Sequence, residues 1–267
     1  MAIRTIQEWK IDKRGALHLL PGIPDKSVQL ILTDLPYGST NCAWDTPIDL
    51  KRLWPEYKRI IKKDDAVVLT ASQPFTSVLV MSNIDMFRYE WIWEKDRPSN
   101  INCADIQPMK YHENILIFGK GRIKYNPQKI ERTSSRVADG IRNKNIVRAG
   151  FKDLNSKPNY KEYSFERYDP DFKNPSTLLY HPRKQNGIHP AQKPIPLFEY
   201  LINTYTDEGD YVHDSCLGSG TTLEACVNLN RNFIGFEITD KWEWNYHKIM
   251  DRKKNMYQLS RIFKREL

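Results

Sequence analysis

The sequence has 267 residues and a formal net charge of +8, which allows one large core with at most a modest insertion and favours a polyanionic partner. No run approaches the roughly 18 apolar residues of a membrane span, and the opening MAIRTIQEWKIDKRG lacks the apolar core of a signal peptide, so we expect an intracellular, cytoplasmic protein without membrane attachment. The four cysteines, Cys42, Cys103, Cys216 and Cys226, form no C-x-x-C pair, which argues against a zinc site or a disulfide framework.

The first half of the sequence alternates strand-like and helix-like segments. They follow one another at 27–33, 48–61, 66–71 and 74–83. This alternation predicts a mostly parallel sheet flanked by helices. Two further strand-like runs, 86–95 and 113–120, have no helical pattern of adequate length between them, which predicts an antiparallel pair at an edge of the sheet.

The segment 120–185 loses this regular pattern and is strongly basic. It holds 16 Lys or Arg against 7 Asp or Glu. Such a composition is also typical of disorder, but aromatic residues are interleaved with the charges: Tyr125, Tyr160, Tyr163, Phe165, Tyr168 and Phe172. These favour a small ordered insertion that contacts nucleic acid.

Regular structure resumes in the last third of the chain. The expected elements are a helix at 195–205, a strand at 210–215, a helix at 221–230, a strand at 232–238 and a long C-terminal helix from about residue 239. We therefore predict one α/β domain made of residues 1–119 and 186–267, interrupted by the insertion 120–185.

A glycine-rich turn joins the strand at 210–215 to the next helix. Gly218 and Gly220 let the backbone approach a ligand closely, and Glu237, which ends the following strand 17 residues beyond Gly220, can bind ribose hydroxyls. An ordinary turn would also use these glycines. The strand, turn, helix and strand in succession indicate a nucleotide site.

The chemistry of this turn selects among nucleotides. The lysine of a triphosphate-binding loop is missing, and Leu223 stands where a dinucleotide loop needs a third glycine. Asp214, ahead of the turn, would repel a pyrophosphate but can accept a hydrogen bond from an amino group. The turn therefore suits a cationic or amino-bearing nucleoside such as S-adenosylmethionine.

A second motif, DLPYG, begins at Asp34, directly after the strand at 27–33. Asp, Pro and Gly also form plain β-turns, but ligands of α/β sheets bind outside the carboxyl ends of strands. There, the Asp34 carboxylate and a backbone carbonyl presented by the rigid Pro36 can orient an exocyclic amino group, a poor nucleophile. Tyr37 offers a face on which a base can stack.

Together, DLPY and DSCLGSGTT resemble the [DNS]-P-P-[YFW] and D-P-F-x-G-S-G-T motifs of the DNA amino-methyltransferases, which use S-adenosylmethionine to methylate adenine N6 or cytosine N4. The order of catalytic motif, basic insertion and cofactor motif is similar to the β class of that family. The resemblance implies a Rossmann-like methyltransferase fold with a seven-stranded sheet and an antiparallel edge strand. It also implies that 120–185 recognises the DNA target, and homodimers are frequent in this class.

The resemblance assigns roles to individual residues. Asp34, Leu35, Pro36 and Tyr37 would form the catalytic pocket. The cofactor-binding residues would be Asp214, Cys216, Gly218, Ser219, Gly220, Thr221, Thr222 and Glu237. HPAQKP at 189–194 is similar to the family's H-P-x-x-K-P segment, which makes His189 and Lys193 candidates near the donor's carboxylate, although the proline also suits a simple helix start.

The sequence departs from the family pattern at three places. Leu35 replaces a proline, but only a backbone carbonyl is needed there, so we expect activity to survive. Ser215 and Cys216 replace Pro-Phe, which can alter donor affinity. Ala16 follows Gly15 where the family often has aspartate, so one donor contact is absent.

The expected reaction is methyl transfer from S-adenosylmethionine to the N6 amino group of an adenine flipped out of duplex DNA. Asp at position 34 favours adenine, by a tendency of the family. Cytosine N4, an RNA base, and a non-catalytic nucleic-acid-binding protein remain the alternatives. The pairs His112-Glu113 and His213-Asp214 lack the spacing of metal ligands, so we expect no metal.

Overall fold

The computed structural model describes residues 5–40, 42, 45–132, 171–183, 188 and 191–263, and within the last helix it describes side chains as far as residue 253. The chain divides into two compact units. The first comprises residues 1–126 and 177–267, and the second comprises residues 127–176. Each unit is described by itself below.

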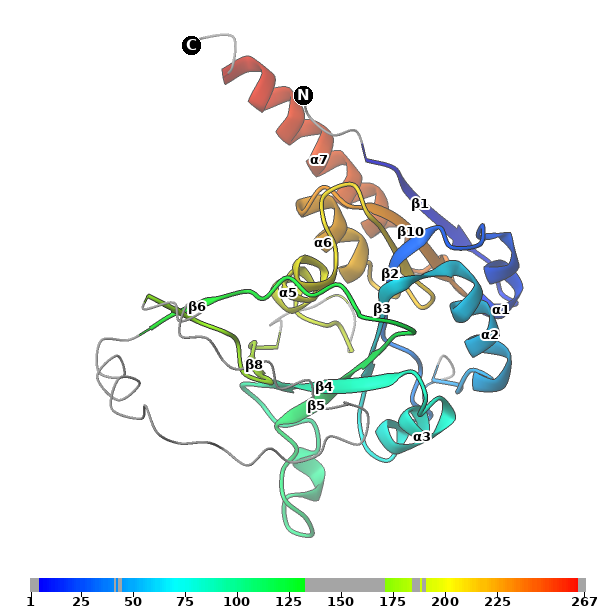
Figure 1. The fold of residues 1–267 in the computed structure, drawn as a ribbon, viewed down its shortest axis with the longest axis vertical. Coiled ribbons are helices and arrows are strands. Elements are labelled where there is room, and N and C mark those ends of the chain that lie inside the picture. The colour runs from blue at the N-terminus through cyan, green and yellow to red at the C-terminus, as the bar shows by residue number, and fades with distance from the viewer. Residues whose placement is uncertain are drawn as a thin grey trace. The chain divides into compact units, whose positions relative to one another are not determined.

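The first unit is built on one large sheet, in which eight strands pair among the described residues (Figure 1). Their order is β1-β10-β9-β2-β3-β5-β4-β8. The bounds are Gln7–Ile11 for β1, Val28–Thr33 for β2, Ile61–Ala71 for β3, Phe87–Glu94 for β4, His112–Phe118 for β5, Leu178–Tyr180 for β8, Tyr211–Asp214 for β9 and Asn232–Glu237 for β10. β5 runs antiparallel to β3 and β4, and the other pairings are parallel.

The predicted mostly parallel α/β sheet is confirmed, but two details differ. The described sheet has eight strands where seven were expected, and the predicted antiparallel pair, β4 with β5, forms but does not end the sheet, because β8 pairs beyond β4. β8 comes from the segment assigned to the insertion. Its three residues are too few to show a strand periodicity.

Helices cover both faces of this sheet, and the strand pleat explains how. Successive residues of β2, such as Leu30 and Ile31, point to opposite faces and join two separate apolar clusters. One cluster includes side chains of α5 (Ile195–Tyr205), α6 (Thr221–Asn228) and α7 (Glu243–Phe263). The other includes side chains of α1 (Ala16–Leu19), the 3-10 turn η1 (Leu20–Gly22), α2 (Leu50–Ile60) and α3 (Phe75–Ser82).

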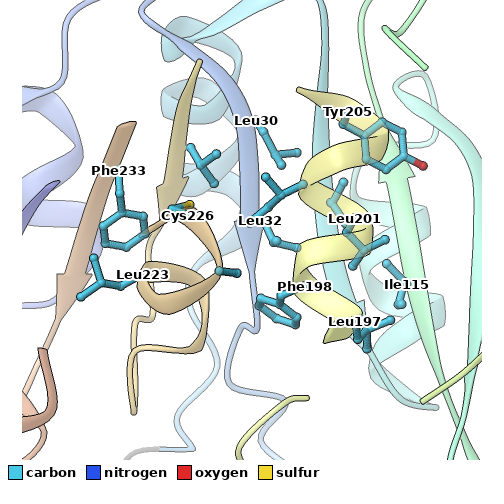
Figure 2. Close-up of a cluster of buried hydrophobic side chains, with 14 of the residues drawn as sticks. Leu30, Leu32, Ile115, Leu197, Phe198, Leu201, Tyr205, Leu223, Cys226 and Phe233 are labelled. Carbon is cyan, nitrogen blue, oxygen red and sulfur yellow. The ribbon is translucent and has the colours of Figure 1, made fainter. Parts of the chain in front are cut away.

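Figure 2 shows the first cluster around β2. Leu30 and Leu32 lie between Leu201 of α5 and the residues of α6, and Phe198 packs below them. Fully buried leucine and phenylalanine side chains each contribute about 2 kcal/mol of transfer free energy. This packing fixes α5 and α6 on β2, so the segments that enter these two helices are held at the same sheet edge.

The strand order creates a crevice at that edge. From β2 the chain proceeds to β3 on one side, whereas from β9 it proceeds to β10 on the other. β2 and β9 are parallel neighbours, with Leu30 opposite Val212 and Ile31 opposite His213. Their carboxyl ends therefore bring Asp34 and Asp214 to one place, where α/β sheets bind ligands.

The second unit contains a two-stranded antiparallel sheet, formed by β6 (Ile130–Glu131) and β7 (Phe172–Lys173). Four of the aromatic residues named for the insertion, Tyr160, Tyr163, Phe165 and Tyr168, lie outside the described residues. Tyr125 belongs to the first unit and Phe172 to the second. In the described part of the chain, no helix is long and apolar enough to cross a membrane.

Candidate active site

A cavity of about 680 Å³ opens at the carboxyl ends of β2, β9 and β10. This is within the usual size range of ligand sites. Most of the residues singled out by the sequence line it: Asp34, Leu35, Pro36, Tyr37, Lys193, Asp214, Cys216, Gly218, Ser219, Thr221, Thr222 and Glu237. Gly220 lies behind the lining, at the start of α6. His189 lies outside the described residues.

Asp34 follows β2 directly, and both of its carboxylate oxygens have partners. Oδ1 accepts hydrogen bonds from the Tyr37 hydroxyl at 2.8 Å and from the hydroxyl of Thr70 on β3. Oδ2 accepts from Lys193 Nζ at 2.6 Å. These bonds fix the orientation of the carboxylate. The side chain is one-quarter exposed and lines the cavity.

The rest of the DLPY motif divides between core and cavity. The Leu35 side chain is 2% exposed and packs in the second apolar cluster. Its role as an apolar anchor explains why leucine is accommodated there. The Tyr37 ring stacks on Phe75 with 5.3 Å between centroids, and Lys193 Nζ lies 5.6 Å from the Tyr37 ring centre. Burial and the charges of Asp34 and Glu113 raise the pKa of Tyr37 well above its usual value, so it remains a hydrogen-bond donor.

The loop after Tyr37 is held by a residue that the sequence reasoning missed. Asp45 accepts hydrogen bonds from the backbone N–H groups of Gly38, Ser39 and Thr40 at 2.7–2.9 Å, and from the Thr40 hydroxyl at 2.8 Å. Burial raises the pKa of Asp45, but these bonds outweigh it and the net shift is downward. An aspartate that follows a Gly-Ser-Thr turn was the available local signal.

Lys193 lies just before α5 and its side chain is 8% exposed. The motif suggested a place near the donor's carboxylate. In the structure its ammonium contacts two carboxylates of the protein, Asp34 Oδ2 at 2.6 Å and Glu113 Oε2 at 3.4 Å. Burial lowers the pKa of Lys193, but Asp34 and Glu113 outweigh burial and raise it overall. Lys193 is therefore a cation.

Glu113 and Lys95 complete this charged group and were not predicted as site residues. Lys95 follows β4, Glu113 belongs to β5, and the β4–β5 register brings them together. Lys95 Nζ lies 2.5 Å from Glu113 Oε1. Burial raises the pKa of Glu113, but Lys193 and Lys95 outweigh it and lower the pKa overall. Two carboxylates and two ammonium groups thus balance in charge.

On the other side of the cavity, Asp214 closes β9 and anchors the glycine turn. Its Oδ1 accepts from the Cys216 N–H at 2.9 Å, and its Oδ2 accepts from the Thr222 hydroxyl at 2.5 Å. The residue is 3% exposed. Burial raises the pKa of Asp214 to about 7, in spite of these hydrogen bonds.

The two glycines of the turn have different surroundings. Both have positive φ, +53° at Gly218 and +91° at Gly220. A Cβ on Gly220 would lie 3.0 Å from the Tyr246 ring, whereas a Cβ on Gly218 would meet nothing nearer than the Cys216 carbonyl at 4.0 Å. Gly220 is therefore required by packing, and Gly218 leaves open space beside the cavity.

Glu237 and α7 hold the turn from outside. Glu237 Oε2 accepts from the Gly218 N–H at 2.7 Å, and Oε1 accepts from the N–H groups of Ile238 and Thr239. Burial raises the pKa of Glu237. From α7, the Tyr246 hydroxyl donates to the Gly218 carbonyl at 2.5 Å. A carboxylate has about four acceptor positions, so Glu237 retains capacity for one more donor.

Ser215, one of the departures from the family motif, has a structural explanation. Its hydroxyl accepts from the Tyr57 hydroxyl at 2.8 Å and lies 2.9 Å from His213 Nε2, and its N–H donates to Thr33 Oγ1 at 3.0 Å. Burial lowers the pKa of His213 to about 4, so it is neutral at physiological pH. A small polar network thus supports the turn at Ser215. The proline that the family motif has at this position could make none of these bonds.

Comparison with known proteins gives a consistent result. A family model described as DNA methylase matches residues 28–248. Type II methyltransferase M.HpaI of Haemophilus parainfluenzae is 26% identical over 247 residues, which cover 85% of this chain and 69% of that protein. Type II methyltransferase M1.MboII of Moraxella bovis is 25% identical over 254 residues, covering 87% of this chain and 93% of that protein.

Solved structures with the same fold include the complex of M1.HpyAVI with S-adenosylmethionine, with 21% identity and a TM-score of 0.57, covering 91% of this chain and 99% of that one. Another is the cytosine-N4-specific PvuII DNA methyltransferase, with 17% identity and a TM-score of 0.58, covering 94% of this chain and 93% of that one. At these identities the likeness is one of fold.

Proposed function

The chain belongs to the DNA methylase family, and from that premise we propose that it transfers a methyl group from S-adenosylmethionine to the N6 amino group of an adenine flipped out of duplex DNA. One observation carries the proposal. The ends of two neighbouring parallel strands bring the Asp34 carboxylate and the Asp214 turn into one cavity, although 180 residues separate them in the sequence. An amino-group acceptor and a nucleoside-binding turn thus face the same space.

The donor side of the cavity fits S-adenosylmethionine by its chemistry. Asp214 and Glu237 are buried carboxylates, which suit amino and hydroxyl groups and disfavour a phosphate. The open space beside Gly218 allows a ligand to approach the backbone. When bound, S-adenosylmethionine supplies a methyl group activated by a sulfonium. Asp214, Gly218, Ser219, Thr221, Thr222 and Glu237 are the residues that would hold it.

The catalytic side needs an acceptor rather than a nucleophile. Positive charge develops at the amino nitrogen as its lone pair is withdrawn from the base ring. An Asp34 carboxylate that accepts one N–H bond stabilises this charge, and the Leu35 backbone carbonyl, presented by the rigid Pro36, accepts the other. Tyr37 donates to Asp34 Oδ1 and so fixes the direction of Oδ2. Asp34, which accepts a hydrogen bond from this amino group in the proposed complex, would also accept the proton that the nitrogen must lose.

DNA is the substrate that the family and the charge distribution support. A paired base cannot present its amino group inside the helix, so the base must be flipped, as in other enzymes that modify bases. The basic segment 120–185 would supply phosphate contacts and some base contacts. Adenine is preferred because of Asp at position 34, which is the family tendency stated above.

The test is to incubate the purified protein with mixed-sequence duplex DNA and methyl-labelled S-adenosylmethionine, followed by mass spectrometry of the nucleosides. We expect labelled N6-methyladenine from the wild type and none from Asp34→Ala, which should still bind the donor in calorimetry. Asp85→Ala, at an exposed aspartate outside the cavity lining, is the matched control and should remain active.

Other outcomes would change the proposal in defined ways. Labelled N4-methylcytosine would keep the mechanism and replace the base. Label on RNA alone would replace the nucleic acid. Donor and DNA binding without any labelled nucleoside would indicate a non-catalytic binding protein and would overturn the proposal.

A further inference from the structure

Lys193 contacts both groups to which the proposed function assigns the target base. Its Nζ donates to Asp34 Oδ2 at 2.6 Å, and the same atom lies 5.6 Å from the centre of the Tyr37 ring. Asp34 Oδ1 already accepts from Tyr37 and Thr70. Oδ2 is therefore the oxygen left for the target amino group, and Lys193 already occupies one of its two acceptor positions.

Glu113 offers Lys193 a second position. Its Oε2 lies 3.4 Å from Lys193 Nζ, is buried, and accepts no hydrogen bond from the described residues. Its Oε1 is bound by Lys95 at 2.5 Å. If the Lys193 ammonium moved by about 1 Å, Glu113 Oε2 would come within normal hydrogen-bond distance. The ammonium would then be bonded to Glu113 Oε2 in place of Asp34 Oδ2. The buried Oε2, which is within ion-pair distance of Lys193 but accepts no hydrogen bond from the described residues, would then gain one.

We infer that Lys193 and the target amino group compete for Asp34 Oδ2, and that Glu113 accepts the displaced ammonium when the base enters. This inference rests on the proposed function. Lys193 and Glu113 are positioning residues, because they act through Asp34. The ammonium stays within the pocket throughout, so base entry never leaves a buried cation without a carboxylate.

The exchange predicts opposite effects for two substitutions. In Lys193→Met the amino group meets no competitor for Oδ2. In Glu113→Gln the alternative acceptor loses its charge, and Lys193 is held more firmly on Asp34. If the charged group of Asp34, Lys193, Glu113 and Lys95 merely supported the fold, both substitutions would weaken binding of the target base.

The measurement compares two duplexes that carry the methylated sequence identified in the activity assay. One has the target base, and the other has the same base without its amino group: purine for adenine, or 2-pyrimidinone for cytosine. The dissociation constants are measured with S-adenosylhomocysteine present. The ratio of the dissociation constants for the two duplexes measures the preference for the amino group. A substitution that weakens DNA binding in general lowers both affinities equally and leaves this ratio unchanged.

We expect the preference to rise about tenfold in Lys193→Met and to fall about tenfold in Glu113→Gln; tenfold corresponds to about 1.4 kcal/mol, which is on the scale of one hydrogen bond to a charged group. The double variant should match Lys193→Met, because Glu113 acts only through Lys193. Lys193→Arg keeps a cation on Asp34 and should remain near the wild type. Lys51→Met and Glu94→Gln make the same charge changes at exposed side chains outside the cavity lining and should leave the ratio unchanged.

Three results would overturn the inference: changes of the same sign in both variants, a change in only one of them, or a double variant that resembles Glu113→Gln. S-adenosylhomocysteine affinity, measured for each variant, verifies that the pocket is folded. A wild-type protein that methylates no base would refute the proposed function, and the inference with it. If the wild type methylates DNA but the ratios of dissociation constants in the variants differ from those expected, the inference alone is refuted.

Discussion

Asp214 lies beneath the glycine turn as a buried carboxyl whose pKa is raised to about 7 from the usual 3.8. In the folded protein it therefore ionises only near neutral pH, whereas in the unfolded chain it ionises near pH 4. The folded state is favoured by this group at low pH, and that contribution is lost as the pH rises from about 4 to about 7.

Asp214→Asn should remove this pH dependence, because the amide keeps the size of the side chain and can still pair with the Cys216 N–H and the Thr222 hydroxyl. We expect the free energy of unfolding of the variant, relative to the wild type, to be higher at pH 8 than at pH 5 by on the order of 2 kcal/mol. Urea titrations at both pH values measure it. The matched control is Asp105→Asn, at an exposed aspartate. A difference that does not change with pH would contradict the burial argument.

The residues of the site divide according to what holds them together. Asp34, Tyr37, Gly218 and Gly220 belong to short motifs, in which a strand end or a tight turn fixes the side chain locally, and the sequence was sufficient to single them out. Thr70, Lys95 and Glu113 reach the pocket through the registers of β3, β4 and β5. No local pattern marks them, because an aligned strand pair is a property of the folded sheet.

Among the elements, the turn between β9 and α6 needs its two glycines for different reasons: Gly220 for packing and Gly218 for access to the cavity. Gly220→Ala would strain a positive φ and press a methyl group against Tyr246, so we expect a loss of stability of at least about 1–2 kcal/mol. Gly218→Ala meets no close atom, so it should cost less stability but should weaken S-adenosylmethionine binding, because its methyl group enters the space beside the cavity.

Thermal unfolding measures the loss of stability in each alanine variant, and calorimetric titration with S-adenosylmethionine measures the loss of donor affinity. Each variant is the control for the other, since both place alanine at positive φ within the same turn. Equal losses of stability and of donor affinity in the two variants would show that backbone strain alone governs this turn.

The elements were predictable where they are long. Continuous apolar runs gave β2 and the part of β3 at 66–71, and helical periodicity gave α2 and α5, because each of these segments buries a full face. The inner position of β5 and the presence of β8 were missed for a physical reason. Strand order is set by pairing across the whole sheet, which no single segment specifies, and a three-residue strand is stabilised by its neighbour, not by its own sequence.

For the whole molecule, the excess of positive charge in 120–185 should govern DNA affinity through counterion release. We expect the logarithm of the association constant to fall linearly with the logarithm of salt concentration. Replacing four lysines of this segment by serine should make the slope less negative by up to about 3.6, at about 0.9 for each phosphate that a lysine no longer neutralises. The substitutions are Lys144→Ser, Lys152→Ser, Lys157→Ser and Lys161→Ser.

Fluorescence anisotropy with a labelled duplex at several salt concentrations measures this slope. A control with the same change of net charge replaces four exposed lysines of the first unit: Lys10, Lys13, Lys51 and Lys58. If the control variant changed the slope as much as the variant in 120–185, the charge of the molecule as a whole would explain the binding, and no particular segment would be responsible.

The pairing of β2 with β9 also decides when the site comes into being during synthesis. Leu30 and Val212 are partners across that pair, so the ribosome makes the strand that precedes Asp34 long before its neighbour exists. A nascent chain can close the local β2–β3 pair early, but it cannot form the proposed donor side of the cavity until β9, α6 and β10 have emerged. Truncated products of translation would therefore carry the proposed catalytic carboxylate without the residues proposed to hold the methyl donor beside it.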